Sequence, residues 1–99
     1  MSAMEFDFSG VIWHWRGPAP FYFVTVPEDE SALIKDDATS ISYGWGMIPV
    51  DARIGTTTWY TAMFEKDGRY VLPVKVAIRR AEQLDEGDTA TVHIAVRVR

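Results

Sequence analysis

Basic and aromatic side chains are the residue types in this sequence best suited to chemistry with a ligand. Aromatic rings stack on planar groups, and lysine and arginine side chains hold anions. Lys75 follows Pro73 at the predicted start of a helix, where free backbone N–H groups add to the attraction for an anion. We therefore expect a small anionic or planar ligand, or a protein partner, to bind at a surface drawn from these residues: Trp13, Arg16, Tyr43, Trp45, Arg53, Lys66, Lys75 and Arg79.

Two other interpretations of these residues stay open. A small barrel needs large side chains to fill it, so Trp13, Trp45 and Trp59 are also candidates for the core. Arg79 and Arg80 are equally typical of a solvated helix face.

No sequence pattern predicts catalytic, metal-binding or cofactor-binding residues. His14 and His93 fall on separate predicted strands at opposite ends of the chain, with no glycine-framed serine near either. The metal-ligand spacing His-Glu-x-x-His is missing, and so is cysteine. We expect both histidines to be exposed strand residues and the chain not to be an enzyme. One enzymatic hypothesis remains, in which His14 acts with Arg16 and a carboxylate.

The acidic clusters fit structural roles, and the glycines do not form a phosphate-binding loop. The acidic residues at 28–30, 36–37 and 85–88 fit a helix N-terminus, a helix exit and a turn. Gly44 and Gly46 flank a tryptophan and lack the following Lys-Ser or Lys-Thr of a phosphate-binding loop.

Length and composition predict one globular domain over residues 1–99. A chain of this size can bury only one core, and 47% hydrophobic with 13% aromatic residues suffices for it. The net charge of -4 opposes nonspecific binding to nucleic acids or anionic membranes. The lack of cysteine favours a reducing compartment, and the acidic N-terminus has no apolar signal region. We expect a cytoplasmic protein without a membrane span.

The alternation of apolar and polar residues predicts an N-terminal strand with a change of phase. Met4, Phe6 and Phe8 alternate with polar residues, whereas Val11 and Trp13 fall on the opposite parity. A bulge near residues 9–10 would explain the change. After the turn at residues 17–20, an apolar strand over 21–26 is expected to form a hairpin with the strand before it.

The remaining elements follow from proline, glycine and hydrophobic spacing. A helix is expected from Pro27 to about Ala38, and a second one from Val74 with Ala77, Ile78, Ala81 and Leu84 on its buried stripe. Asp67 and Gly68 give the signal of a tight hairpin turn. The other predicted strands cover residues 43–54, 56–64, 69–72 and 90–98.

The order strand, proline, helix, loop and strand occurs twice, over residues 21–54 and 69–98. Two such pseudo-equivalent halves can complete each other's sheet and leave few exposed edges. We therefore predict a mainly β fold with two short helices, forming a small closed or pseudo-barrel like the double-split β-barrel. Such a chain can pair its own sheet edges without a second copy, so we expect a monomer.

Two family resemblances accompany this pattern. The segment over residues 70–92 resembles the swapped hairpin of AbrB-like regulators and MazE-like antitoxins, which implies a nucleic-acid-binding alternative that would use Lys75, Arg79 and Arg80. A second resemblance rests on motifs at residues 8–10, 13–20, 23–27, 43–46, 52–55 and 72–75. With these motifs, nearly the whole chain resembles a prokaryotic domain of unknown function, DUF1905, found alone or ahead of a YdeI/OmpD-associated segment. That resemblance implies no activity.

Overall fold

The computed structural model describes residues 4–16, 20–36 and 46–97. Within these residues the chain forms seven strands and two helices. Their bounds, in chain order, are β1 Met4–Val11, β2 Trp13–Arg16, β3 Pro20–Thr25, α1 Glu28–Asp36, β4 Ile48–Ile54, β5 Thr57–Lys66, β6 Arg69–Pro73, α3 Val76–Ala81 and β7 Thr89–Val96.

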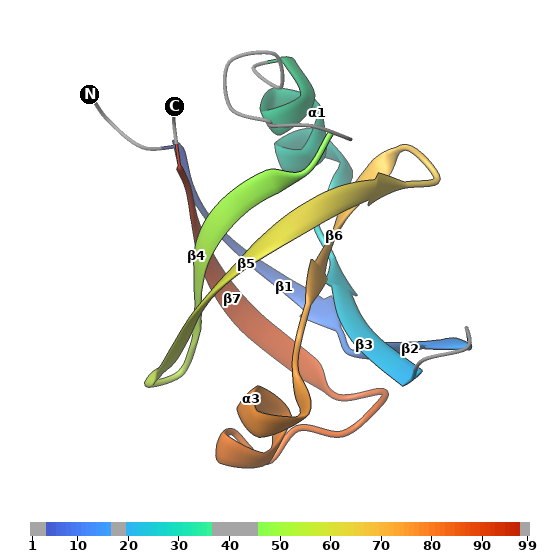
Figure 1. Cartoon of the computed structure of the whole chain (residues 1–99), viewed down its shortest axis with the longest axis vertical. Helices are drawn as coiled ribbons and strands as arrows, with labels where there is room; N and C mark the ends of the chain where they lie inside the picture. Colours follow the sequence, from blue (N-terminus) through green and yellow to red (C-terminus); the bar gives the residue numbers. More distant parts are fainter. Residues whose placement is uncertain (1–3, 17–19, 37–45, 98–99) are drawn as a thin grey trace.

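The strands form one curled antiparallel sheet in the order β1-β7-β4-β5-β6-β3-β2 (Figure 1). Its two outermost strands, β1 and β2, follow one another in the chain and are separated only by Ile12. The Ile12 N–H donates to the Asp88 carbonyl at 2.9 Å, and the Ile12 carbonyl accepts from the Gly87 N–H at 2.8 Å. A single N-terminal run therefore borders both edges of the sheet, which confirms the predicted barrel-like fold.

The two strand-helix-strand units pair with each other, as the repeat predicts. β3 pairs antiparallel with β6, and β4 pairs antiparallel with β7. β5 joins the two pairs, because residues 57–63 face β4 and residues 64–66 face β6. The helices lie at opposite ends of the curled sheet (Figure 1).

A tight turn connects β5 to β6. Asp67 has φ 54° and Gly68 has φ 82°, the two left-handed residues that a type I′ hairpin needs. The hairpin predicted from this Asp-Gly pair is confirmed.

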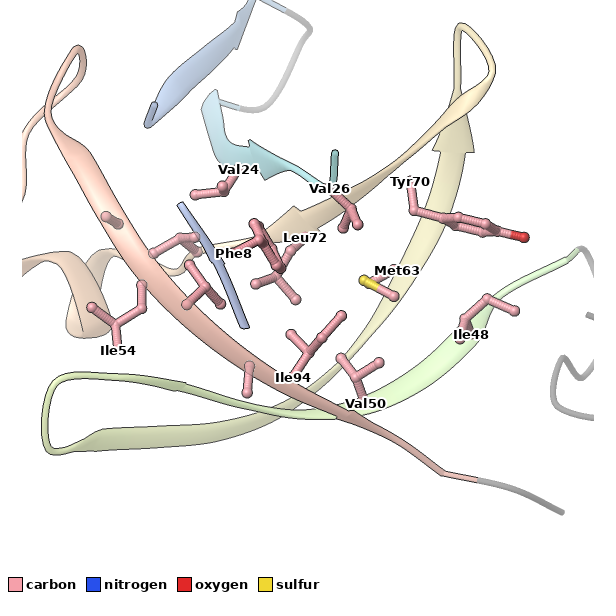
Figure 2. Close-up of a cluster of buried hydrophobic side chains, with 14 of the residues drawn as sticks. Phe8, Val24, Val26, Ile48, Val50, Ile54, Met63, Tyr70, Leu72 and Ile94 are labelled. Atoms are coloured by element: carbon pink, nitrogen blue, oxygen red, sulfur yellow. The ribbon is translucent and has the colours of Figure 1, made fainter. Parts of the chain in front are cut away.

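Aliphatic side chains from the inward faces of the strands fill the core (Figure 2). The alternation in β7 is confirmed, because Ala90, Val92, Ile94 and Val96 are all buried. The other buried members include Phe8, Ile12, Val24, Val26, Ile34, Ile48, Val50, Ile54, Met63, Tyr70, Leu72, Val74 and Ile78.

The predicted change of phase after Gly10 is wrong. Val11 is 51% exposed and Ile12 is fully buried, so the inward parity of Phe8 continues through Ile12. Gly10 does not form a bulge; it pairs with Ala90 and lies where β1 passes close to β3. The alternation also continues beyond Ile12, because Trp13 packs on Phe23, which is not part of the main core, whereas His14 stacks on Tyr22, which packs against it.

α1 begins after Pro27 with three acidic residues in its first turn, where carboxylates favour the helix dipole. Ile34 inserts into the core. The buried Ser31 hydroxyl donates to the Val26 carbonyl at 3.1 Å and accepts from the Tyr70 N–H at 3.1 Å. These bonds fasten the helix to β3 and β6. The predicted end at Ala38 lies outside the described residues.

α3 ends at Ala81 and is shorter than the helix predicted from the buried stripe, which extended to Leu84. Ile78 is buried and Leu84 packs against the core, but Ala77 and Ala81 are exposed, so that part of the prediction is wrong. The helix stops because Gln83 adopts φ 56°. The Leu84 N–H then donates to the Arg79 carbonyl at 2.8 Å, the closing bond of a Schellman cap. Leu84 reaches the core through this cap instead of through another helical turn.

We predict that Gly10→Ala weakens closure of the sheet. An added Cβ would lie 2.7 Å from the Val24 Cγ1 and 3.4 Å from the Thr25 carbonyl, so β1 and β3 must separate. Overpacking of this kind costs about 1–3 kcal/mol. Urea unfolding measures the loss, and the neighbouring exposed Ser9→Ala is the control, with an expected change within about 0.5 kcal/mol. An unfolding free energy of Gly10→Ala equal to that of the original protein would contradict this packing.

Candidate functional site

Five aromatic side chains form a cluster on the outer side of β2, β3 and β5, which we call the aromatic face. Phe23 is 4% exposed yet lies outside the main core, whereas its neighbour Val24 lies inside it. The two residues point to opposite sides of the sheet because side chains alternate along a strand. The members of the aromatic face are Trp13, Trp15, Phe21, Phe23 and Phe64.

The rings of the aromatic face pack on one another around Phe23. The Trp13 centroid lies 5.2 Å from that of Phe23 and 6.1 Å from that of Trp15, the latter pair being stacked with an interplanar angle of 24°. Phe64 meets Phe23 edge-on at 5.6 Å. The Trp13 indole N–H donates to the Thr25 hydroxyl at 2.9 Å, which fixes the orientation of that ring. Phe21 remains 56% exposed.

A lysine lies over the aromatic face. The Lys66 Nζ is 5.0 Å from the Trp15 ring centroid and also donates to the Asp67 carboxylate at 2.8 Å. The structure thus brings together two of the predicted site residues, Trp13 and Lys66. The core interpretation fits Trp59 instead, because Trp59 packs against the main core and its indole N–H donates to the Pro73 carbonyl at 3.2 Å.

A small hollow adjoins the aromatic face at Phe21. We call it the Lys75 hollow; its volume is about 240 Å³, and it is lined by Phe21, Tyr22, Pro73, Val74, Lys75 and Val76. Lys75 is exposed, and its side chain makes no hydrogen bond or ion pair with any residue that the structure describes. This third predicted site residue is thus an available cation beside apolar walls.

Tyr22 lies between elements from three parts of the chain. The Arg79 guanidinium is 3.6 Å from the Tyr22 ring centroid, and the His14 ring stacks on Tyr22 at 4.8 Å. The Arg79 Nε and His14 Nε2 atoms are buried and have no hydrogen-bond partner among residues 4–16, 20–36 and 46–97. Arg79 is therefore held against Tyr22 and is not part of a solvated helix face, and the expectation that His14 is exposed is wrong.

The outer face of β1, β7, β4 and β5 is polar. His93 lies between two carboxylates, with Nδ1 2.9 Å from Asp7 Oδ1 and Nε2 3.1 Å from Glu5 Oε1. Both contacts are hydrogen bonds only when the imidazole carries a proton on each nitrogen. The side chain is 26% exposed, so His93 is a partly covered, tethered residue and not the exposed one expected. The outward polar positions of β1 and β7 could have suggested this contact, but only with their pairing known.

Arg53 belongs to this polar face and not to the aromatic face. Its Nη1 donates to the Gly55 carbonyl at 3.3 Å, and it lines a hollow of about 300 Å³ together with Asp51, Thr58, Tyr60 and His93. The Asp51 carboxylate accepts two bonds from Arg97, at 2.9 and 3.0 Å. The Arg97 guanidinium also lies 4.5 Å from the Tyr60 ring centroid.

The remaining predicted residues add nothing to these surfaces. Arg16 is exposed at the end of β2, while Tyr43 and Trp45 lie outside the described residues. No group of three histidine or carboxylate side chains within the described ranges has an arrangement that would hold a metal ion. None of the described helices is both long and apolar enough to cross a membrane.

We predict that the pKa of Asp51 depends on Arg97. The hydrogen-bonded guanidinium holds the pKa of this carboxyl below its ordinary value of 3.8. A lowered folded-state pKa means that the pair stabilises the protein above the unfolded-state pKa and that this contribution is lost as the pH falls through the folded-state pKa. NMR titration of the Asp51 carboxyl should show its pKa rising in Arg97→Met.

The matched control is Lys35→Met, which removes a different exposed ion pair, with Glu65 at 3.0 Å. The pKa of Asp51 should not change in that variant. An equal Asp51 pKa with and without the Arg97 guanidinium would show that the pair does not form in solution.

A protein-family model matches most of this chain. No curated protein is similar to this chain at a significant level. Residues 8–94 match the model of a family described as a domain of unknown function, DUF1905. The match begins within β1 and ends within β7, so it spans the curled sheet and both helices. The relationship to AbrB-like and MazE-like proteins stays a prediction. Since the matched segment covers most of the sequence, the chain belongs to the DUF1905 family.

Proposed function

We propose that this protein is a noncatalytic binding module that holds a small, planar, negatively charged ligand on the aromatic face. The observation that carries the proposal is the packing of Trp13, Trp15 and Phe23 outside the core, with the Lys66 ammonium 5.0 Å from the Trp15 ring. None of these rings belongs to the core inside the barrel, which is filled mostly by aliphatic side chains together with Phe8 and Tyr70.

Stacking supports a planar ligand in preference to other apolar groups. A ring laid on an aromatic side chain gains about 1–3 kcal/mol, and an adjacent cation attracts the negative charge of an acid. The Trp13 hydrogen bond to Thr25 holds its ring in place before any ligand arrives. Little ordering of the site is then needed on binding.

The placement of the histidines favours binding over catalysis. His14 stacks on Tyr22, and both nitrogens of His93 are in contact with carboxylates on β1. Neither imidazole belongs to the aromatic face, so a ligand held there has no general acid or base from these residues.

The nucleic-acid alternative has less support. It depends on a basic helix face of Lys75, Arg79 and Arg80, and the Arg79 guanidinium is already held 3.6 Å from the Tyr22 ring centroid. The net charge of -4 also opposes attraction to phosphate polymers. We further propose that the module acts as a monomer in the cytoplasm, because the chain lacks cysteine and its edge strands are consecutive.

The test is binding of 2-naphthoate, a planar aromatic carboxylate, followed by tryptophan fluorescence and NMR. Trp15→Ala should weaken binding at least about tenfold, since it removes one stacking partner and the ring beneath Lys66. Lys66→Met should weaken 2-naphthoate but leave the uncharged 2-naphthamide unaffected. Trp59→Phe is the control, because Trp59 packs on the core side.

Circular dichroism and the unfolding midpoint establish that each variant is folded before binding is compared. Equal 2-naphthoate affinities in Trp15→Ala and Trp59→Phe would refute the aromatic face as the binding site. Amide shifts confined to the polar face around Arg53 would refute it as well.

A further inference from the structure

The Lys75 hollow has features of a second binding site, for a ligand that need not be planar. Its walls are apolar: Val76 is 45% exposed and Phe21 is 56% exposed, and they are joined there by Pro73 and Val74. Two large apolar side chains that share one hollow and remain open to solvent indicate a surface that gains free energy when covered.

The walls of the hollow are built on fixed backbone. The Val74 N–H donates to the Tyr22 carbonyl at 2.9 Å, which continues the pairing of β3 with the end of β6. The Tyr22 ring is held by the Arg79 guanidinium and by the His14 ring. The hollow therefore exists before a ligand binds.

Charge decides what kind of apolar ligand fits. Lys75 has no ion-pair partner among the described residues, and Arg79 adds a second positive charge close to Tyr22. An ammonium group is a point charge with three donors, suited to a single carboxylate. The hollow of about 240 Å³ lies below the roughly 300–1,000 Å³ that is typical of pockets for drug-sized ligands. The occupant must therefore be compact.

The geometry points to the Lys75 hollow as a binding site for a compact apolar monocarboxylate, whose hydrocarbon part lies against Phe21, Val74 and Val76 and whose carboxylate meets Lys75. This inference does not rest on the proposed function, because the hollow shares only Phe21 with the aromatic face. Its cation comes from the segment between β6 and α3, and its walls come from β3, the end of β6 and the start of α3.

The probe is cyclohexanecarboxylate, which is apolar and anionic but offers no flat ring for stacking. Titration monitored by amide NMR should shift Tyr22, Val74, Lys75 and Val76 at millimolar ligand. Lys75→Met should lower the affinity about fivefold, the loss of one exposed charge contact. The uncharged cyclohexanecarboxamide should bind with that lower affinity to both proteins.

Two further variants separate this site from its surroundings. Arg80→Met removes an α3 cation that lines the neighbouring hollow and not this one, so it should leave the affinity unchanged. Trp15→Ala disrupts the aromatic face and should also leave it unchanged. Val76→Glu places a carboxylate in the wall and should abolish the shifts without unfolding the protein, because Val76 is 45% exposed.

The outcomes distinguish the two proposals. Cyclohexanecarboxylate binding that survives Trp15→Ala and falls in Lys75→Met supports the Lys75 hollow whether or not 2-naphthoate binds the aromatic face. Absence of shifts at millimolar ligand, shifts centred elsewhere, or equal affinity in Lys75→Met and Arg80→Met would overturn it.

Discussion

The closure of the sheet by one N-terminal run is the constraint on which the rest of the structure depends. β1 pairs with β7, and β2 pairs with β3. The hydrogen bonds of Ile12 with Asp88 and Gly87 extend the pairing of β1 with β7 up to the residue before β2. A sheet edge is otherwise a row of unpaired backbone groups and a liability. Here the two outermost strands, β1 and β2, are consecutive in the chain. When β1 pairs with β7, it therefore brings β2 close to β3, with which β2 pairs.

Closure of the sheet also separates an inner side from an outer side. Val24, Leu72 and Ile94, which lie on the inner side of the curled sheet, are all fully buried in the core. The candidate sites among the described residues lie on the outer surfaces, which differ in kind. One outer surface carries the contacts of His93 with two carboxylates and the ion pair of Asp51 with Arg97, and the other carries aromatic rings and cations. The second is the surface suited to a planar or apolar acid.

Local sequence signals predict the elements whose structure depends on near neighbours. The alternation in β7, the Asp67-Gly68 turn and the acidic start of α1 are each decided within a few residues. The phase of residues 10–13 is different, because it depends on how closely β1 approaches β3 at Gly10. The stripe of α3 fails for a related reason: the left-handed Gln83 ends the helix and sends Leu84 inward.

The types of residue in the candidate site could be predicted from the sequence, but which of these residues lie together could not. Trp13 and Lys66 come together only because β5, β6, β3 and β2 are neighbours in the sheet, and Arg53 is separated from them by the same strand order. The stack of His14, Tyr22 and Arg79 joins three distant segments, which no local spacing reveals. Strand order is a property of the whole chain, so the sequence offered candidates without their partners.

Native-state amide hydrogen exchange at Ile12 is the most direct test of closure. If the N-terminal run seals both edges, the amides of Ile12 and Gly87 should exchange with the same opening free energy as that of Ile94, which lies in β7 between β1 and β4. Rapid exchange at Ile12, with protection kept at Ile94, would show that β1 and β2 are frayed ends of an open sheet and would contradict the account.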